Sequence, residues 1–317
     1  MKIRDINEIL AKISDVRVEA VSPFEKEFKK CCALIEAGGQ NHQSAQNDLI
    51  VLALLCQCPK SIRQYLHNII FFKRKTIPLI VDDVKHIGIF TEVVMLTIKK
   101  SAKILEKEIA VSLKFDIRDL DDENIKCFKG LFQLADRIDL AYCSLFHSHN
   151  CVKLLDVILE ASKHYSEINL SYNVTGYHEG DRIDKFDWFP KVGNQLKELD
   201  VKVIRLKGVL LPCNASNSKL MFYLVEAALK NKKLSVLDVR ANNFQHFYPG
   251  DWTERFPELI KISSLEQLLF DRYSDIDEKL ITELLLAKNT RYGSPGLFDG
   301  KVTDSISMSG SRTACNF

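Results

Sequence analysis

Short apolar runs recur along the chain with a polar residue between their central apolar positions, and each run predicts a β-strand. The clearest is LSVLDVRANNF at residues 234–244, where apolar residues at 234, 237, 239 and 244 and Asn242 follow the pattern L-x-x-L-x-L-x-x-N-x-L. YSEINLSYN at 165–173 repeats the pattern, and so does ADRIDLAYCSL at 135–145, with Cys143 in the asparagine place. Weaker units in the same frame are centred on Leu113/Phe115, Ile204/Leu206 and Leu268/Phe270, and the weakest on Val16/Val18, Leu52/Leu54 and Leu79/Val81.

The spacing of these units indicates a repeat. Their central positions are residues 16, 52, 79, 113, 138, 168, 204, 237 and 268, so that eight intervals cover 252 residues, or about 31 each. Segments with helical periodicity follow the apolar runs, the clearest at 150–163, 219–232, 251–262 and 277–289. The order strand, turn, helix, turn therefore recurs at one period.

A unit of one strand and one helix cannot bury its own apolar face, whereas stacked units can. The pattern therefore predicts an α/β solenoid with a curved parallel sheet inside and helices on the convex face, in which the Asn or Cys of each turn bonds backbone groups that leave the sheet. A doubly wound α/β domain also alternates strand and helix, but the chain has no glycine-rich turn after any of its predicted strands.

These units resemble the ribonuclease-inhibitor-like class of leucine-rich repeats, well over residues 135–285 and poorly over 10–134. Only Asn173, Asn242 and Cys143 carry the turn residue of that family; other residues occupy its place elsewhere, namely Val84, Arg118, Val209 and Tyr273. The chain also resembles, in composition, the leucine-rich-repeat effectors that intracellular bacteria inject into host cells. That resemblance implies a protein partner in a host cell, and an export signal in the C-terminal tail.

Three regions are predicted along the chain. Residues 1–60 form an N-terminal cap, helical or a degenerate repeat, because SAQNDLIVLALLCQ (44–57) fits a buried helix as well as a strand. Residues 61–290 form the solenoid. Residues 291–317 are rich in Gly, Ser and Thr without periodicity, and predict a flexible tail.

Composition narrows the function classes. A formal net charge of +2 gives no overall field that would attract nucleic acid. The longest apolar run, Leu49 to Cys56, is eight residues, far short of the roughly 20 that span a bilayer. Nine cysteines without regular spacing, and an N-terminus without the apolar core of a secretory signal, predict a protein of the cytoplasm, or one secreted into a host cell by a non-classical route. The oligomeric state stays open.

Enzyme motifs for phosphate, dinucleotide, zinc-protease and serine-hydrolase chemistry are missing from the sequence, and no paired ligand set predicts a metal or another cofactor. The alternative to a binding protein is a cysteine-dependent hydrolase or transferase, with Cys143 and either His147 or His149 as its nearest pair. Because Cys143 occupies a turn position of the repeat, a structural role already accounts for it.

Protein binding is the predicted function, through the inner face of the sheet or the rim loops. Residues between and just after the central apolar positions should point to the inner face, which either binds a partner or is simply solvated. They are Lys114 and Asp116, Asp139 and Tyr142, Asn169 and Tyr172, Arg205 and Lys207, Asp238 and Arg240, and Asp271 and Arg272. The rim segments 174–190 and 244–252 add Tyr177, His178 and Tyr248, whereas Trp188 and Phe189 could instead plug onto neighbouring helices.

Overall fold

A computed structural model of the chain describes residues 29–35, 42–173, 188–209, 215–242 and 249–269. The helices are residues 29–35, α3 (His42–Leu55), α4 (Lys60–Ile70), α5 (Glu92–Ile104), α6 (Asp122–Leu134), α7 (Asn150–Glu160), α8 (Phe189–Glu198), α9 (Ala215–Lys230) and α10 (Pro249–Ile262). The strands are β1 (Thr76–Val81), β2 (Glu108–Leu113), β3 (Arg137–Asp139), β4 (Tyr165–Asn169), β5 (Val201–Arg205), β6 (Val236–Asp238) and β7 (Gln267–Leu269). Short 3₁₀ helices are η1 (Val84–Ile89), η2 (Ile117–Asp119) and η3 (Leu145–His147).

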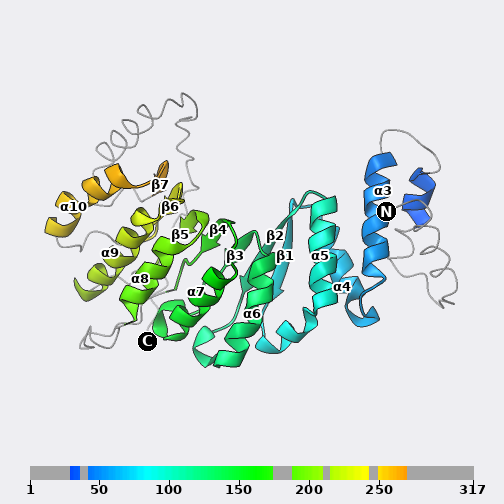
Figure 1. Ribbon diagram of the computed structural model, residues 1–317, viewed down its shortest axis with the longest axis horizontal. Coiled ribbons are helices and arrows are strands. Elements are labelled where there is room, and N and C mark those ends of the chain that lie inside the picture. Colours follow the sequence, from blue (N-terminus) through cyan, green and yellow to red (C-terminus); the bar gives the residue numbers. More distant parts are fainter. Residues whose placement is uncertain (1–28, 36–41, 174–187, 210–214, 243–248, 270–317) are drawn as a thin grey trace, which may run out of the picture.

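The seven strands form one parallel sheet in sequence order, from β1 to β7. A helix separates each strand from the next, and neighbouring helices from α5 to α10 contact one another in the same order. Figure 1 shows these helices as one row along the sheet. The predicted α/β class and a parallel sheet of at least six strands are confirmed, and the strand order lacks the reversal that a doubly wound sheet would show.

The core lies between the sheet and the helix row. Alternate residues of each strand are buried there, such as Ile77, Leu79 and Val81 in β1. The residues between them are partly exposed on the opposite side, because successive side chains of a strand point to opposite faces. We call this second side the open face; it is the surface predicted as the inner face.

Register locates the repeat more accurately than the apolar pattern did. Residues Leu79, Val111, Ile138, Ile168, Ile204, Leu237 and Leu268 pair in sequence across the sheet. The step between partners ranges from 27 residues (Val111 to Ile138) to 36 (Ile168 to Ile204). The predicted centres are therefore confirmed at six places, and the prediction of Leu113 is wrong by two residues.

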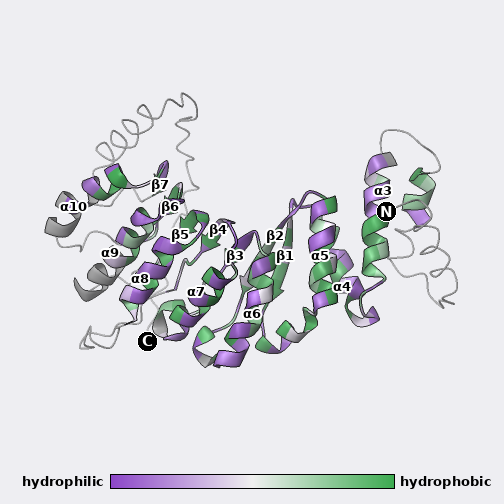
Figure 2. Cartoon of the chain, viewed as in Figure 1, coloured by the Kyte–Doolittle hydropathy of each residue, from purple (hydrophilic) through white to green (hydrophobic). Residues whose placement is uncertain are grey.

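The unit at Leu52/Leu54, for which helix and strand were both left open, is helical. Both residues lie in α3, whose second half is continuously apolar (Figure 2). A helix that is buried on several sides shows such a run, and periodicity alone does not separate it from a strand. The unit at Val16/Val18, the segment 277–289 and the predicted tail 291–317 lie outside the described residues.

Aspartates at element ends act as caps. Asp121 precedes α6, and its carboxylate accepts a hydrogen bond from the backbone N–H of Asn124 at 2.7 Å. Asp83 accepts one from Lys85 in the same way, at 2.9 Å. No helix in the described part of the chain has both the length and the apolar content that crossing a bilayer requires.

Candidate binding surface on the open face of the sheet

The turns that follow strands β3 to β6 have a shared backbone shape. Tyr142, Tyr172, Gly208 and Ala241 follow these strands in turn and adopt left-handed φ angles of 63°, 58°, 57° and 57°. Their backbone N–H groups continue the ladder from turn to turn: that of Tyr142 donates to the Ser171 carbonyl, that of Tyr172 to Lys207, and that of Gly208 to Arg240. The Cα atoms of these four residues therefore occupy equivalent places along one edge of the open face.

Buried amides hold the turns in this shape. Asn173 accepts from the backbone N–H groups of Cys143 and Leu145 at 2.9 and 3.1 Å, and its Nδ2 donates to the carbonyls of Leu140 and Leu170 at 2.7 and 2.9 Å. Asn242 has the equivalent role two repeats later, where its Oδ1 accepts from the Val209 N–H at 2.8 Å. The asparagine of the sequence pattern thus satisfies backbone groups that the ladder leaves unpaired.

Two tyrosines stack at the centre of this edge. The rings of Tyr142 and Tyr172 lie 4.7 Å apart between centroids and 7° from parallel. Behind Tyr172 is Gly208, where an added Cβ would come within 2.6 Å of the ring. Tyr142, at the outer end of the stack, is 69% exposed. The stack is therefore supported on one side and presents an aromatic ring on the other.

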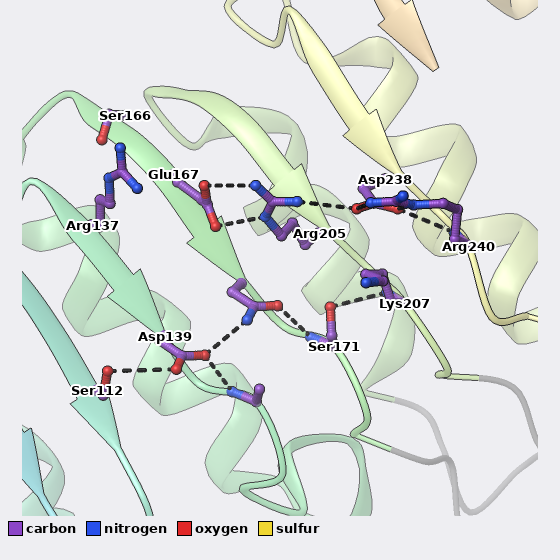
Figure 3. Close-up of polar contacts among 12 residues, drawn as sticks. Ser112, Arg137, Asp139, Ser166, Glu167, Ser171, Arg205, Lys207, Asp238 and Arg240 are labelled. Atoms are coloured by element: carbon purple, nitrogen blue, oxygen red, sulfur yellow. Dashed lines mark hydrogen bonds and ion pairs between the residues drawn. The ribbon is translucent and has the colours of Figure 1, made fainter. Parts of the chain in front are cut away.

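Asp139 is the centre of a first polar cluster on the open face (Figure 3). Its carboxylate accepts from the ammonium of Lys114 at 2.7 Å and from the amide of Asn169 at 2.9 Å. The hydroxyl of Ser112 lies 3.5 Å away on the neighbouring strand. These residues come from three adjacent strands or their ends, which the parallel register brings side by side.

Arg205 is the centre of a second cluster (Figure 3). Its guanidinium donates to both carboxylate oxygens of Glu167, at 2.6 and 3.1 Å, and to Asp238 at 3.1 Å. Arg240 donates to Asp238 as well, through Nε and Nη2, at 2.9 and 2.8 Å. Burial acts to raise the pKa of Asp238, but hydrogen bonds and the charge of Arg240 outweigh it, so that the pKa lies below its usual value.

Lys207 lies between the second cluster and the tyrosine stack. Its backbone carbonyl receives the N–H of Tyr172, and its own N–H donates to the hydroxyl of Ser171 at 3.1 Å. Within the described ranges, no carboxylate lies at ion-pair distance from its ammonium group. Within those ranges Lys207 thus carries a cation that has no carboxylate at ion-pair distance, and its backbone carbonyl is bonded to Tyr172.

Most of the described residues predicted for the inner face do lie on or beside the open face: Lys114, Asp139, Tyr142, Asn169, Tyr172, Arg205, Lys207 and Arg240. Asp238 is a correction, because its carboxylate is fully covered and bonded to two arginines, and cannot serve as an accessible contact. Predicted residues outside the described ranges are Asp271, Arg272, Tyr177, His178 and Tyr248.

Asp116 is a second correction, caused by the frame error at β2. This strand ends at Leu113, so Asp116 falls in the following turn. There its carboxylate caps η2 by accepting from the Arg118 N–H at 2.9 Å, and it pairs with the Arg118 guanidinium. It also accepts from the hydroxyl of Ser144 at 3.1 Å. Its role is to hold a turn rather than to present charge on the sheet.

Two residues of this network were not predicted from the sequence: Glu167, on the open face, and Ser171, which is buried. Glu167 precedes the central Ile168 of its strand by one residue, and Ser171 follows it by three. The predicted set was limited to positions after the first central apolar residue of each strand. Counting one position before it on every strand would have found Glu167, and also Arg137, which pairs with Glu108 at 2.8 Å.

Cys143 is buried and engaged as a turn residue. Its thiol donates to the Leu113 carbonyl at 3.1 Å, and burial raises its pKa to about 12. A thiol in that state is protonated near pH 7 and is a poor nucleophile. His149, one of its suggested partners, has its ring centroid 6.3 Å from that of Trp188.

Trp188 and Phe189 are buried, which confirms that they plug onto the helix layer. In the described part of the chain, no three His, Cys, Asp or Glu side chains gather as a metal site would require.

Comparison with known proteins does not assign the chain to a family. No protein-family model matches the chain, and no curated protein matches it. The open face itself is therefore the basis for inferring a function.

Proposed function

We propose that the chain is a leucine-rich-repeat solenoid that binds another protein through its open face, with Tyr142 at the centre of the contact. The sequential parallel strands, the near-regular register step and the buried turn asparagines support the solenoid. Neither the partner nor the host-cell setting follows from these features, so the resemblance to injected bacterial effectors stays a prediction.

The observation that carries the proposal is the exposed Tyr142, stacked on Tyr172. A left-handed conformation costs an L-residue with a side chain on the order of 1–2 kcal/mol, and Gly208 shows that glycine fits the equivalent turn. Two adjacent turns nevertheless carry tyrosine. Because exposed tyrosines contribute little to folding but are enriched among the residues that dominate interfaces, binding accounts for this cost better than stability does.

A comparative capture experiment tests the proposal. The full chain, the Tyr142→Ala/Tyr172→Ala variant and a Tyr223→Ala control are immobilised, and each is incubated with the same cell lysate. Tyr223 is an exposed tyrosine on α9, in the helix row. We expect at least one protein to bind the wild type and the control but not the double variant. Its affinity, measured after purification, should fall by about 2 kcal/mol or more, roughly thirtyfold.

Thermal unfolding of the double variant separates binding from folding. The loss of a stacked aromatic pair costs about 1 kcal/mol, so a folded variant with a slightly lower melting temperature is expected. Captured proteins that bind the double variant as well as the wild type would contradict the proposal. Equal loss on Tyr223→Ala would do the same, because it would place the contact on the helix row.

The cysteine-enzyme alternative gains no support from the described residues. Cys143 has a raised pKa, and Cys151 is fully buried with its pKa raised by that burial. Neither thiol is therefore set up as a nucleophile.

A further inference from the structure

Charges on the open face are arranged by depth. Asp238 is 0% exposed, whereas the side chains of Arg205 and Arg240 that pair with it are 33% and 37% exposed. Glu167 is 19% exposed beneath the same Arg205. The pair of Lys114 and Asp139 has the same order, at 39% and 30%. In each of these pairs the carboxylate lies deeper and the cation reaches over it, whereas Arg137 and Glu108 on the same face are equally exposed, at 44%.

The cations of these pairs keep unused hydrogen-bond donors, whereas the carboxylates already accept bonds. A guanidinium has five N–H groups, of which Arg205 uses three on Glu167 and Asp238. An ammonium has three, of which Lys114 uses one on Asp139. The carboxylates have their oxygens directed at these donors. An approaching molecule therefore meets N–H donors with capacity left, above acceptors that are already engaged.

Lys207 adds a cation to this layer, and its backbone carbonyl accepts from the N–H of Tyr172. Four cations (Lys114, Arg205, Lys207 and Arg240) stand over three carboxylates (Asp139, Glu167 and Asp238), so the described network has an excess of one positive charge. That excess belongs to Lys207, whose position is one residue before Gly208, the residue behind Tyr172. Because the Lys207 carbonyl accepts from the N–H of Tyr172, on which Tyr142 stacks, a peptide long enough to cover the Tyr142 ring can also reach Lys207.

We infer that the open face binds an acidic peptide segment of its protein partner, with a carboxylate at Lys207 and a planar side chain on Tyr142. This inference rests on the proposed function and names the chemistry of the partner. A basic segment would meet cations at the surface and carboxylates that are already paired, so like-charge repulsion disfavours it.

A nucleic acid fits this surface less well. Affinity for a phosphate backbone requires many cations in excess, because each neutralised phosphate contributes separately. The network has an excess of one, and the whole chain has a formal charge of only +2. A short peptide with one or two carboxylates next to an aromatic residue matches both the charge and the ring.

The test is a selection of random 12-residue peptides displayed on phage against the immobilised full chain. Selected peptides are synthesised with a fluorescent label, and their affinities are measured by anisotropy for the wild type, Tyr142→Ala, Lys207→Glu, Lys207→Gln and Lys191→Glu. Lys191 is an exposed lysine in the first turn of α8, where a glutamate is tolerated, so it controls for the change in net charge.

We expect the selected peptides to be rich in Asp and Glu around an aromatic residue. Lys207→Glu should weaken them at least tenfold, Lys207→Gln by less, and Lys191→Glu by under twofold. Affinity should also fall when salt rises from 50 to 300 mM, since partly exposed charges are screened.

The outcomes separate the two proposals. Peptides that lose binding on Tyr142→Ala but are neutral or basic, or that keep their affinity for Lys207→Glu, would overturn the acidic segment and leave the proposed function standing. Peptides unaffected by both changes would contradict the proposed function as well, and so would a selection that enriches nothing. A labelled oligouridylate of 12 nucleotides that binds as tightly as the peptides and loses affinity on Lys207→Glu would assign the surface to RNA instead.

Discussion

Replacement of Asn173 by alanine is the most direct test of how the turns are held. The amide side chain is fully buried and bridges two neighbouring repeats. Alanine would remove the acceptor for the N–H groups of Cys143 and Leu145, and the donor for the carbonyls of Leu140 and Leu170. Four backbone groups would then be left in the core without their present partner.

The magnitude follows from the cost of unsatisfied groups. A buried polar group that loses its partner costs about 1–3 kcal/mol, and a water that enters the space of the amide would recover part of that. Over these four groups we expect Asn173→Ala to lower the free energy of unfolding by about 3 to 5 kcal/mol. Asn173→Asp should cost a similar amount, because it keeps the shape but directs a buried carboxylate at two carbonyls.

Asn169→Ala is the matched control. Asn169 lies on the strand of the same repeat and also makes side-chain hydrogen bonds, to Asp139 and to the N–H of Ser171. Its side chain is only half-buried, so water can replace it. The expected loss is about 1 kcal/mol or less.

Two measurements check the prediction. Urea unfolding followed by far-UV circular dichroism gives the loss of stability. Hydrogen exchange with mass spectrometry shows whether the amides of Cys143 and Leu145 lose protection first in Asn173→Ala. A loss under about 1 kcal/mol, or unchanged exchange at those two amides, would refute the view that the asparagine holds the turn.

Three further predictions concern backbone strain, acid stability and thiol reactivity. Ala241→Gly should raise the stability by about 0.5–1 kcal/mol in thermal unfolding, whereas Gly208→Ala should lower it by more than that. Both positions have positive φ, and a Cβ at position 208 would also press against the Tyr172 ring. A loss of stability in Ala241→Gly, or a gain in Gly208→Ala, would contradict the strain at these turns. The folded state holds the pKa of Asp238 below the ordinary value of 3.8, so its contribution to stability is present above that pH and is lost as the pH falls through the lower, folded value. Asp238→Asn should therefore be less stable at pH 7 and should lose less stability on acidification, and parallel curves for the two proteins would count against the ion pairs. Brief iodoacetamide treatment of the native protein should label the exposed Cys127 and leave Cys143 unlabelled, as peptide mass spectrometry would show; rapid labelling of Cys143 would revive the cysteine-enzyme alternative.

Three of the six confirmed strand centres are marked by a turn residue, whereas Leu79, Ile204 and Leu268 were placed by the repeat spacing alone. Ile138, Ile168 and Leu237 were placed correctly, because Cys143, Asn173 and Asn242 mark the turn five residues after each of them. A side chain that must satisfy particular backbone groups can occupy few other places, so it fixes the register of the strand before it.

The errors occurred where no such residue is present. In β2 the apolar positions alternate from Ile109 to Phe115, and two frames fit that run equally well. Pairing of Val111 with both Leu79 and Ile138 decides between them, and this pairing depends on contacts remote in sequence. The same lack of a marker left helix and strand undecided for the continuous apolar run of α3.

The side of the sheet on which the candidate-site residues lie was predictable, but the burial of each side chain was not. Strand alternation correctly assigned Asp139, Arg205 and Asp238 to one side of the sheet. It treated them as equivalent, although Asp238 is covered by two arginines and Arg205 reaches the surface. Depth depends on the length of a side chain and on what its neighbours place above it. A short carboxylate on the sheet accepts bonds from longer basic chains on adjacent strands, so the same mixed sequence of charges yields a surface of donors over a layer of acceptors. The affinity of such a sheet face for an acidic partner therefore depends on how the side chains of several stacked repeats are layered. This layering cannot be predicted from the sequence of a single repeat.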